Sequence, residues 1–176
     1  IHISQSDDID MIANTIFNTV IGNQINGIYL ANCNGFLIDD HYGVENVGPG
    51  LYNNRDYGIY LYYCGDSLYT TTISDNYIYY NNDHGLYAYY SDYIDICGNE
   101  IFDHTYRGVY LLYSDNIELS SNTIEDNNNG IYIEYSISYD LSYNNFVDNV
   151  KYGLFFEDSY IPLEDATRGV TNNAFT

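Results

Sequence analysis

A glycine-led repeat runs along nearly the whole chain of 176 residues, and it limits the possible fold more than any other feature. Glycine, an aliphatic residue and usually an aromatic residue recur in register, and the later spacings settle at 22 to 23 residues. Periods of 20 to 50 residues are typical of architectures in which each unit buries its apolar face against the next unit. We therefore expect a stack of similar units, led by Gly27, Gly58, Gly85, Gly108, Gly130 and Gly153.

Within each unit, apolar residues alternate with polar ones, which is the period of a β-strand with one buried face. The alternating pairs include Ile94/Ile96, Ile117/Leu119 and Tyr139/Leu141. About three short strands fit into one unit, and the turns between them are too short for helical crossovers. The sequence predicts an all-β fold, a parallel β-solenoid with about 22–23 residues per coil and roughly six and a half coils.

Two further positions repeat in the turns. A small residue lies six positions after each glycine, in the order Cys33, Cys64, Ser91, Ser114, Ser136 and Ser159, and an asparagine recurs later as Asn76, Asn99, Asn122 and Asn144. We expect aliphatic ladders inside the coil, Asn amides bonded from rung to rung, and glycine where the backbone needs positive φ or close approach. Cys33, Cys64 and Cys97 occupy small-residue positions, and since parallel Cβ vectors disfavour a disulfide between stacked residues, we expect free thiols.

The pattern G-[ILV]-Y-x-x-x-S followed by N-x-I-x-x-N, as in Gly108-Val109-Tyr110 to Ser114 and Asn122-Thr123-Ile124, resembles the repeats of the NosD-like family. This family is common in surface proteins of methanogenic archaea, and the resemblance implies a right-handed parallel β-helix over nearly the whole chain. It implies little about function, because the same scaffold carries lyases, hydrolases, adhesins and structural proteins.

The composition excludes several classes of partner. Four Lys plus Arg against 25 Asp plus Glu give a net charge of −21, which repels phosphate backbones and anionic lipid surfaces. Nucleic acid is therefore not an expected partner. No apolar run approaches the ~18 residues of a membrane span, and the first residues do not resemble a signal peptide. Tyrosine is over-used, with 24 residues, whereas tryptophan is absent.

Residues 1–176 are predicted to form a single domain whose two ends fall in mid-coil. An uncovered terminal coil exposes apolar side chains and unpaired strand edges. Two explanations stay open: the sequence is a piece of a longer protein, or neighbouring copies stack on the open ends. Departures from the repeat spacing predict inserted loops at about 39–48 and 65–72. Asp39, Asp40, His41 and Glu45 in the first loop form either a metal or catalytic cluster or an ordinary solvated loop.

Two outward aromatic ladders are predicted. The first contains Tyr29, Tyr60, Tyr87, Tyr110, Tyr132 and Phe155, and the second contains Tyr63, Tyr90, Tyr113 and Tyr135. Three uses stay open for them: stacking that only stabilises neighbouring rungs, contact between subunits, and a platform for sugar rings.

Acidic residues are also expected to stack, as Asp95, Glu118 and Asp140 on one outward position and Asp103, Asp126 and Asp148 on another. Carboxylates about 4.8 Å apart either splay into solvent or bind a hard cation such as Ca²⁺. No cofactor is required by the sequence, and Ca²⁺ at Asp95, Glu118 and Asp140 is the one metal that we consider.

No catalytic constellation is recognisable. Enzymes on this scaffold that resemble pectate lyases need Ca²⁺ with an Arg or Lys base, and those that resemble polygalacturonases need paired aspartates with Gly-His-Gly and Arg-Ile-Lys. Only Asp39-Asp40 echoes these patterns, while Arg55, Arg107, Lys151 and His84 gather in the turn before the glycines. The net charge also disfavours action on an acidic glycan.

The sequence alone favours a structural, non-enzymatic role outside the cell or at its surface. The main hypothesis is a building block of an extracellular filament, sheath or surface layer that binds copies of itself through its coil ends and tyrosine ladders. The alternative is a glycan-binding or polysaccharide-processing β-helix within a larger surface protein. The two hypotheses differ in their partner, which is a second copy of the chain or a cell-surface polysaccharide.

Overall fold

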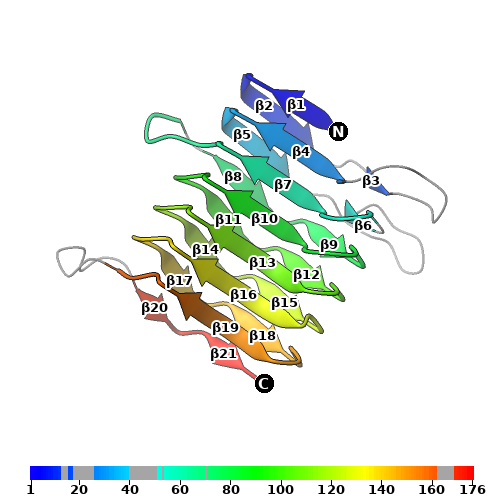
Figure 1. The fold of residues 1–176 in the computed structure, drawn as a ribbon, viewed down its shortest axis with the longest axis vertical. Helices are drawn as coiled ribbons and strands as arrows, with labels where there is room; N and C mark the ends of the chain where they lie inside the picture. The colour runs from blue at the N-terminus through cyan, green and yellow to red at the C-terminus, as the bar shows by residue number, and fades with distance from the viewer. Residues whose placement is uncertain (13–15, 18–25, 40–50, 53, 70, 162–168) are drawn as a thin grey trace.

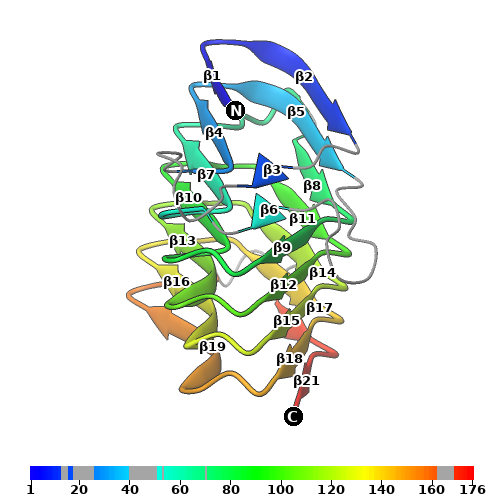
Figure 2. The same cartoon turned by 90° about the vertical axis from the view of Figure 1, so that its right-hand side faces the viewer.

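The protein is described by a computed structural model over residues 1–12, 16–17, 26–39, 51–52, 54–69, 71–161 and 169–176. Its regular elements there are β-strands, which wind into one parallel β-helix with three faces (Figure 1). Viewed from the side, each coil contributes one strand to each face (Figure 2). The predicted all-β solenoid is confirmed.

Each face is a parallel sheet of seven strands. Sheet A contains β1 (His2–Ser4), β4 (Ile28–Ala31), β7 (Ile59–Tyr62), β10 (Leu86–Tyr89), β13 (Arg107–Leu112), β16 (Asn129–Glu134) and β19 (Tyr152–Glu157). Sheet B contains β2 (Asp7–Ile12), β5 (Asn34–Asp39), β8 (Thr72–Ser74), β11 (Asp95–Cys97), β14 (Glu118–Ser120), β17 (Asp140–Ser142) and β20 (Val170–Thr171). Sheet C contains β3 (Ile16–Phe17), β6 (Leu51–Tyr52), β9 (Tyr77–Tyr79), β12 (Glu100–Phe102), β15 (Thr123–Glu125), β18 (Asn145–Val147) and β21 (Ala174–Phe175).

The number of complete coils differs slightly from the predicted six and a half. All three sheets reach seven strands, but β3, β6, β20 and β21 contain only two residues each. The inserted loop predicted at about 39–48 lies almost wholly outside the described residues, as do Asp40, His41 and Glu45. The loop predicted at about 65–72 joins β7 to β8 and exposes Leu68.

The interior consists of aliphatic ladders that pass through the coils in register. In sheet A, Ile59, Leu86, Val109 and Ile131 pair with one another and are fully buried. The alternating pairs expected to point inward do so, because Ile94, Ile96, Ile117, Leu119, Tyr139 and Leu141 are all buried. Removal of these apolar surfaces from water is the main stabilising contribution to the stack.

Buried asparagines tie each coil to the next, as predicted. The Nδ2 group of Asn99 donates to Oδ1 of Asn122 at 3.0 Å, and the same Oδ1 accepts the backbone N–H of Asn99. Asn122 is bonded to Asn144 in the same way. Buried polar groups need such partners, so each asparagine depends on its neighbours above and below.

The small-residue ladder is buried at a different corner of the coil, after the strands of sheet A. The backbone N–H of Cys64 donates to Oγ of Ser91, and that of Ser91 donates to Oγ of Ser114. Cys33, Cys64 and Cys97 are free thiols. Burial is the largest of the effects that raise the pKa of Cys64 to about 11, so its thiol is protonated at neutral pH.

Glycine was predicted where the backbone needs positive φ or close approach, and at the repeat glycines the requirement is close approach. A Cβ on Gly85 would lie 2.6 Å from the carbonyl oxygen of Gly108, so the repeat glycines do permit close approach of coils. The positive φ values fall elsewhere, at corner residues that are mostly not glycine, such as Tyr90 (49°) and Tyr113 (50°). These non-glycine corner residues therefore carry some backbone strain.

A second buried ladder has asparagine at positions 81 and 127 and histidine at position 104 between them. Nδ1 of the His104 ring accepts the backbone N–H of Asn81, and Nε2 lies 3.1 Å from the carbonyl oxygen of Ile78. The backbone N–H of His104 donates to Oδ1 of Asn127. Burial lowers its pKa to about 4.

This buried histidine predicts a pH-dependent difference between the wild type and His104→Asn. Below pH 6.5 the unfolded imidazole takes up a proton that the folded one does not, so the wild type loses stability as the pH falls towards about 4. Asparagine occurs at the equivalent positions 81 and 127 and does not titrate. As the pH falls from 7 to 5, the wild type should lose free energy of unfolding relative to His104→Asn. We expect the difference between the two proteins to change by on the order of 2 kcal/mol in favour of the variant.

Urea unfolding of both proteins at each pH measures this difference, and carboxylates common to both cancel in the comparison. A pH-independent difference would contradict a neutral buried imidazole at position 104.

Candidate functional site

The first predicted aromatic ladder covers the outer face of sheet A. We call this set the ring ladder: Tyr29, Tyr60, Tyr87, Tyr110, Tyr132 and Phe155. The rings of Tyr60, Tyr87 and Tyr110 stack almost in parallel, with centroids 5.1 and 4.9 Å apart and interplanar angles of 6° and 8°. They form a flat aromatic strip along the axis of the coil.

The stacking is interrupted between Tyr110 and Tyr132, whose rings are 5.7 Å apart at 88°. Arg107 lies at this point, with its Cζ 4.1 Å from the centre of the Tyr110 ring and 4.2 Å from that of Tyr132. The hydroxyl of Tyr110 donates to Glu134 at 2.5 Å, and that of Tyr132 donates to Glu157. Both rings are thus fixed around the guanidinium group, a favourable cation–π arrangement.

His84 lies next to Arg107 at the start of the strands. Its ring stacks on Tyr57 at 5.5 Å, its Nδ1 accepts the backbone N–H of Arg107 at 3.3 Å, and its Nε2 lies 3.3 Å from Oδ1 of Asp83. Burial, and then the positive charge of Arg107, lower the pKa of His84 to about 3. The imidazole is therefore neutral at physiological pH.

The second predicted ladder, Tyr63, Tyr90, Tyr113 and Tyr135, follows the corner where sheet A ends; we call it the corner ladder. Its rings stack with centroids 4.9 to 5.0 Å apart and interplanar angles of 7° to 9°. Together with Asp92 and Asp115 they line an open groove with a volume of about 320 Å³. Burial and then the neighbouring charge of Asp115 raise the pKa of Asp92, while the backbone N–H of Asp115 opposes them.

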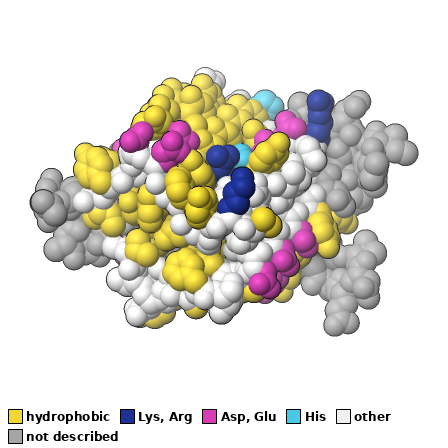
Figure 3. Space-filling model, turned by 60° about the horizontal axis from the view of Figure 1, so that its bottom comes forward, with side chains coloured by type: hydrophobic (Ala, Val, Ile, Leu, Met, Phe, Trp, Pro, Cys, Tyr) yellow, Lys and Arg dark blue, Asp and Glu magenta, His cyan; other side chains and the backbone are white. Residues whose placement is uncertain are grey.

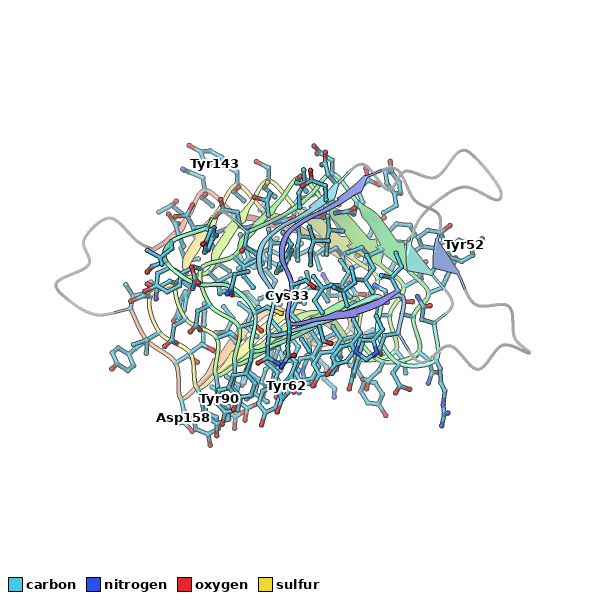
Figure 4. The ribbon with its side chains drawn as sticks, turned by 90° about the horizontal axis from the view of Figure 1, so that it is seen from above. Cys33, Tyr52, Tyr62, Tyr90, Tyr143 and Asp158 are labelled. Carbon is cyan, nitrogen blue, oxygen red and sulfur yellow. The ribbon has the colours of Figure 1, made fainter. Side chains whose placement is uncertain are left out.

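Tyr62 and Tyr89 join the two ladders into one surface. The Tyr62 and Tyr63 rings are 4.7 Å apart, and those of Tyr89 and Tyr90 are 4.5 Å apart. Figure 4, seen along the coil, shows Tyr62 and Tyr90 pointing outward on the same side, with Tyr143 on another side. We call the ring ladder, the corner ladder, Tyr62 and Tyr89 together the aromatic face.

The phenols of Tyr60, Tyr87 and Tyr110 in the ring ladder stay protonated over the physiological range. Burial is the main cause that raises the pKa of Tyr60 to about 12, and it raises the pKa of Tyr87 and Tyr110 further. The rings therefore offer apolar faces with neutral hydroxyl groups at their tips. The space-filling view shows hydrophobic side chains, tyrosine included, beside Lys or Arg and His side chains (Figure 3).

The predicted acidic ladder is in register, because Asp95, Glu118 and Asp140 pair across β11, β14 and β17. Within the described ranges, however, no group of three or more His, Cys, Asp or Glu side chains is placed to hold a metal ion. Calcium binding by these carboxylates stays a prediction.

A smaller groove of about 250 Å³ lies beside the inserted loop, lined by Asp66, Ser67, Leu68, Tyr69, Thr71, Tyr93 and Asp95. Sequence reasoning did not identify this groove, nor Tyr57, Asp92 and Asp115. The repeat gave one signal for the last two, since each aspartate lies two positions after a corner tyrosine. The described residues also contain no helix that could span a membrane.

Comparison with known proteins identifies relatives of the fold. The family model described as the periplasmic copper-binding protein NosD matches residues 1–176. The enzymatically active domain of the bacteriophage CBA120 tailspike protein 2 is similar with a TM-score of 0.53 and 11% identity, over 98% of this chain and 37% of that one. The periplasmic alginate epimerase AlgG is similar with a TM-score of 0.51 and 15% identity, over 92% and 47%.

The chain thus spans less than half the length of either solved structure, and at these identities the likeness shows the fold alone. A comparison with curated proteins gives no match.

Proposed function

The chain belongs to the NosD family, and on that basis we propose that it is a polysaccharide-binding β-helix that acts outside the cytoplasm. The observation that carries this proposal is the aromatic face, where stacked tyrosine rings run along several successive coils. Sugar rings present C–H groups that pack on aromatic faces, and the phenol hydroxyls can bond to sugar hydroxyls. A ladder with one ring per coil suits a chain of repeating sugars better than one small molecule.

The names of the relatives support the same class of ligand and the same location. Both the NosD family and AlgG are described as periplasmic, and AlgG is an epimerase of alginate, a polysaccharide. Nothing in these comparisons supports the filament, sheath or surface layer that the sequence predicted as the main hypothesis. The glycan alternative is therefore the one that we carry forward.

Copper is named in the family description, but the described residues do not fit a copper site. Copper prefers imidazole, thiolate and thioether ligands. Both ring nitrogens of His104 lie at hydrogen-bonding distance from backbone groups, and the thiols of Cys33 and Cys64 donate to backbone carbonyl oxygens. Among the described residues, no group of three or more His, Cys, Asp or Glu side chains is placed to hold a metal ion. We assign copper no role in the function proposed for this chain.

Binding to an array of neutral and acidic polysaccharides, followed by calorimetry on the best ligand, tests the proposal. We expect Tyr87→Ala to weaken binding roughly 10-fold, and the double variant with Tyr110→Ala to weaken it further, because each change removes one ring of the platform. Tyr143→Ala is the matched control, since this exposed tyrosine lies away from the aromatic face (Figure 4).

Equal losses for Tyr87→Ala and Tyr143→Ala, or no binding of the wild type to any glycan of the array, would overturn the proposal. Urea unfolding of each variant verifies that the fold is retained.

A further inference from the structure

Within the part of the chain that the structure describes, Arg107 has no anionic partner, although the sequence carries 25 acidic residues and only four Lys and Arg. Across the described residues, no carboxylate oxygen lies within ion-pair distance of its guanidinium group, and the nearby carboxylate of Asp83 contacts the neutral imidazole of His84 instead. Charged groups that are removed from water are usually paired or hydrogen-bonded, and Nε of Arg107 is buried. An unpaired, half-buried arginine in so acidic a protein therefore needs an explanation.

His84 does not satisfy this guanidinium group. Nδ1 of His84 accepts the backbone N–H of Arg107, so in the neutral ring the proton must be on Nε2. Nε2 is also the nitrogen that lies 3.3 Å from Asp83 and 3.5 Å from Nη1 of Arg107. Nε2 of His84 and Nη1 of Arg107 are then both donors, so the contact between them is not a hydrogen bond. The Nε of Arg107 is buried and has no partner either.

The guanidinium group is nevertheless held in one place. Tyr110 and Tyr132 lie against it, and their hydroxyls are fixed by Glu134 and Glu157. An arginine ordered in advance loses little entropy when it binds a ligand. Its position also matters, since it lies within the ring ladder, one coil beyond Tyr87.

We propose that Arg107 binds the carboxylate of an acidic sugar unit in a polysaccharide that lies along the aromatic face. This inference rests on the proposed function and adds the ligand class. A guanidinium group is planar and matches a carboxylate with two parallel hydrogen bonds. The net charge of −21 repels an anionic chain at long range, but at physiological salt this repulsion is screened beyond about 8 Å, so contacts within the site decide.

Two oligosaccharides with the same backbone isolate the carboxylate: β-1,4-linked mannohexaose and β-1,4-linked hexamannuronate. Calorimetry with the wild type, Arg107→Met and Lys151→Met gives the comparison. Methionine keeps the apolar stem between the two rings and removes the charge. Lys151 is exposed, and its change to methionine removes the same charge elsewhere on the surface.

We expect the wild type to bind hexamannuronate at least 10-fold more tightly than mannohexaose. Arg107→Met should weaken hexamannuronate binding by roughly 10- to 100-fold, as for the loss of a hydrogen-bonded charge, and change mannohexaose binding less than about 3-fold. Lys151→Met should leave both affinities within about 3-fold of the wild type. If Arg107→Met does not fold, Arg107→Lys retains the charge without the fork and should still weaken the acidic ligand.

Equal affinity of the wild type for the two ligands, or equal weakening of both by Arg107→Met, would overturn this inference and leave the proposed function standing. Failure of the wild type to bind any glycan would overturn both.

Discussion

Replacing Asn122 with alanine should lower the free energy of unfolding by about 4 kcal/mol, the largest effect that we expect for one side chain. The Oδ1 atom of Asn122 accepts both the backbone N–H and the Nδ2 group of Asn99, and its own Nδ2 donates to Ile96 and Asn144. Alanine leaves donors of Asn99 buried without an acceptor, and each such group costs about 1–3 kcal/mol. The remainder comes from the space that the amide leaves.

Equilibrium unfolding in urea, followed by tyrosine fluorescence, measures this loss. Asn145→Ala is the matched control, because Asn145 points outward from β18 and the change should alter stability by less than about 0.5 kcal/mol. Similar losses for the two variants would mean that the buried amide ladder does not hold the coils together.

Replacing Gly85 with alanine should cost about 3 kcal/mol, at the upper end of the range for overpacking. The added Cβ would lie 2.5 Å from Nε2 of His104, 2.6 Å from the carbonyl oxygen of Gly108 and 2.7 Å from Cγ2 of Ile101. A backbone carbonyl on the next coil cannot turn aside as a side chain can. The two coils must move apart, which weakens their hydrogen bonds.

Gly169→Ala provides the comparison, because the nearest atom to its Cβ would be Cγ2 of Thr171 at 3.9 Å. We expect its unfolding midpoint in urea to stay close to that of the wild type. If Gly85→Ala behaved like Gly169→Ala, the close approach of neighbouring coils at the repeat glycines would not limit the sequence.

Much of the fold could be predicted from the sequence, because the spacing and the apolar alternation of the repeat determine the shape of each coil. The spacing of Gly85, Gly108 and Gly130 sets the length of a coil, and the alternation at Ile94 and Ile96 sets which side chains point inward. Rung-to-rung bonding of Asn99 and Asn122 also follows, since an asparagine recurring in a turn has an identical neighbour above and below it.

The details of the aromatic face do not follow from the repeat. The repeat assigns each tyrosine to a ladder. The orientation of the Tyr132 ring, however, is linked to its contact with Arg107, and arginine occupies this position in one coil only. The corner conformation of Tyr90 was also missed, because positive φ is usually assigned to glycine or asparagine. Features that differ from one coil to the next are the ones that a repeat cannot predict.

The spacing of the buried asparagines also determines how the chain can fold. Asn76 to Asn99, Asn99 to Asn122 and Asn122 to Asn144 are separated by 23, 23 and 22 residues, so each of these central coils closes a loop of nearly the same size. The entropy cost of closure is then similar at every step. Among these central coils no single one is required as the starting point, so folding can begin at any adjacent pair of them and spread in both directions.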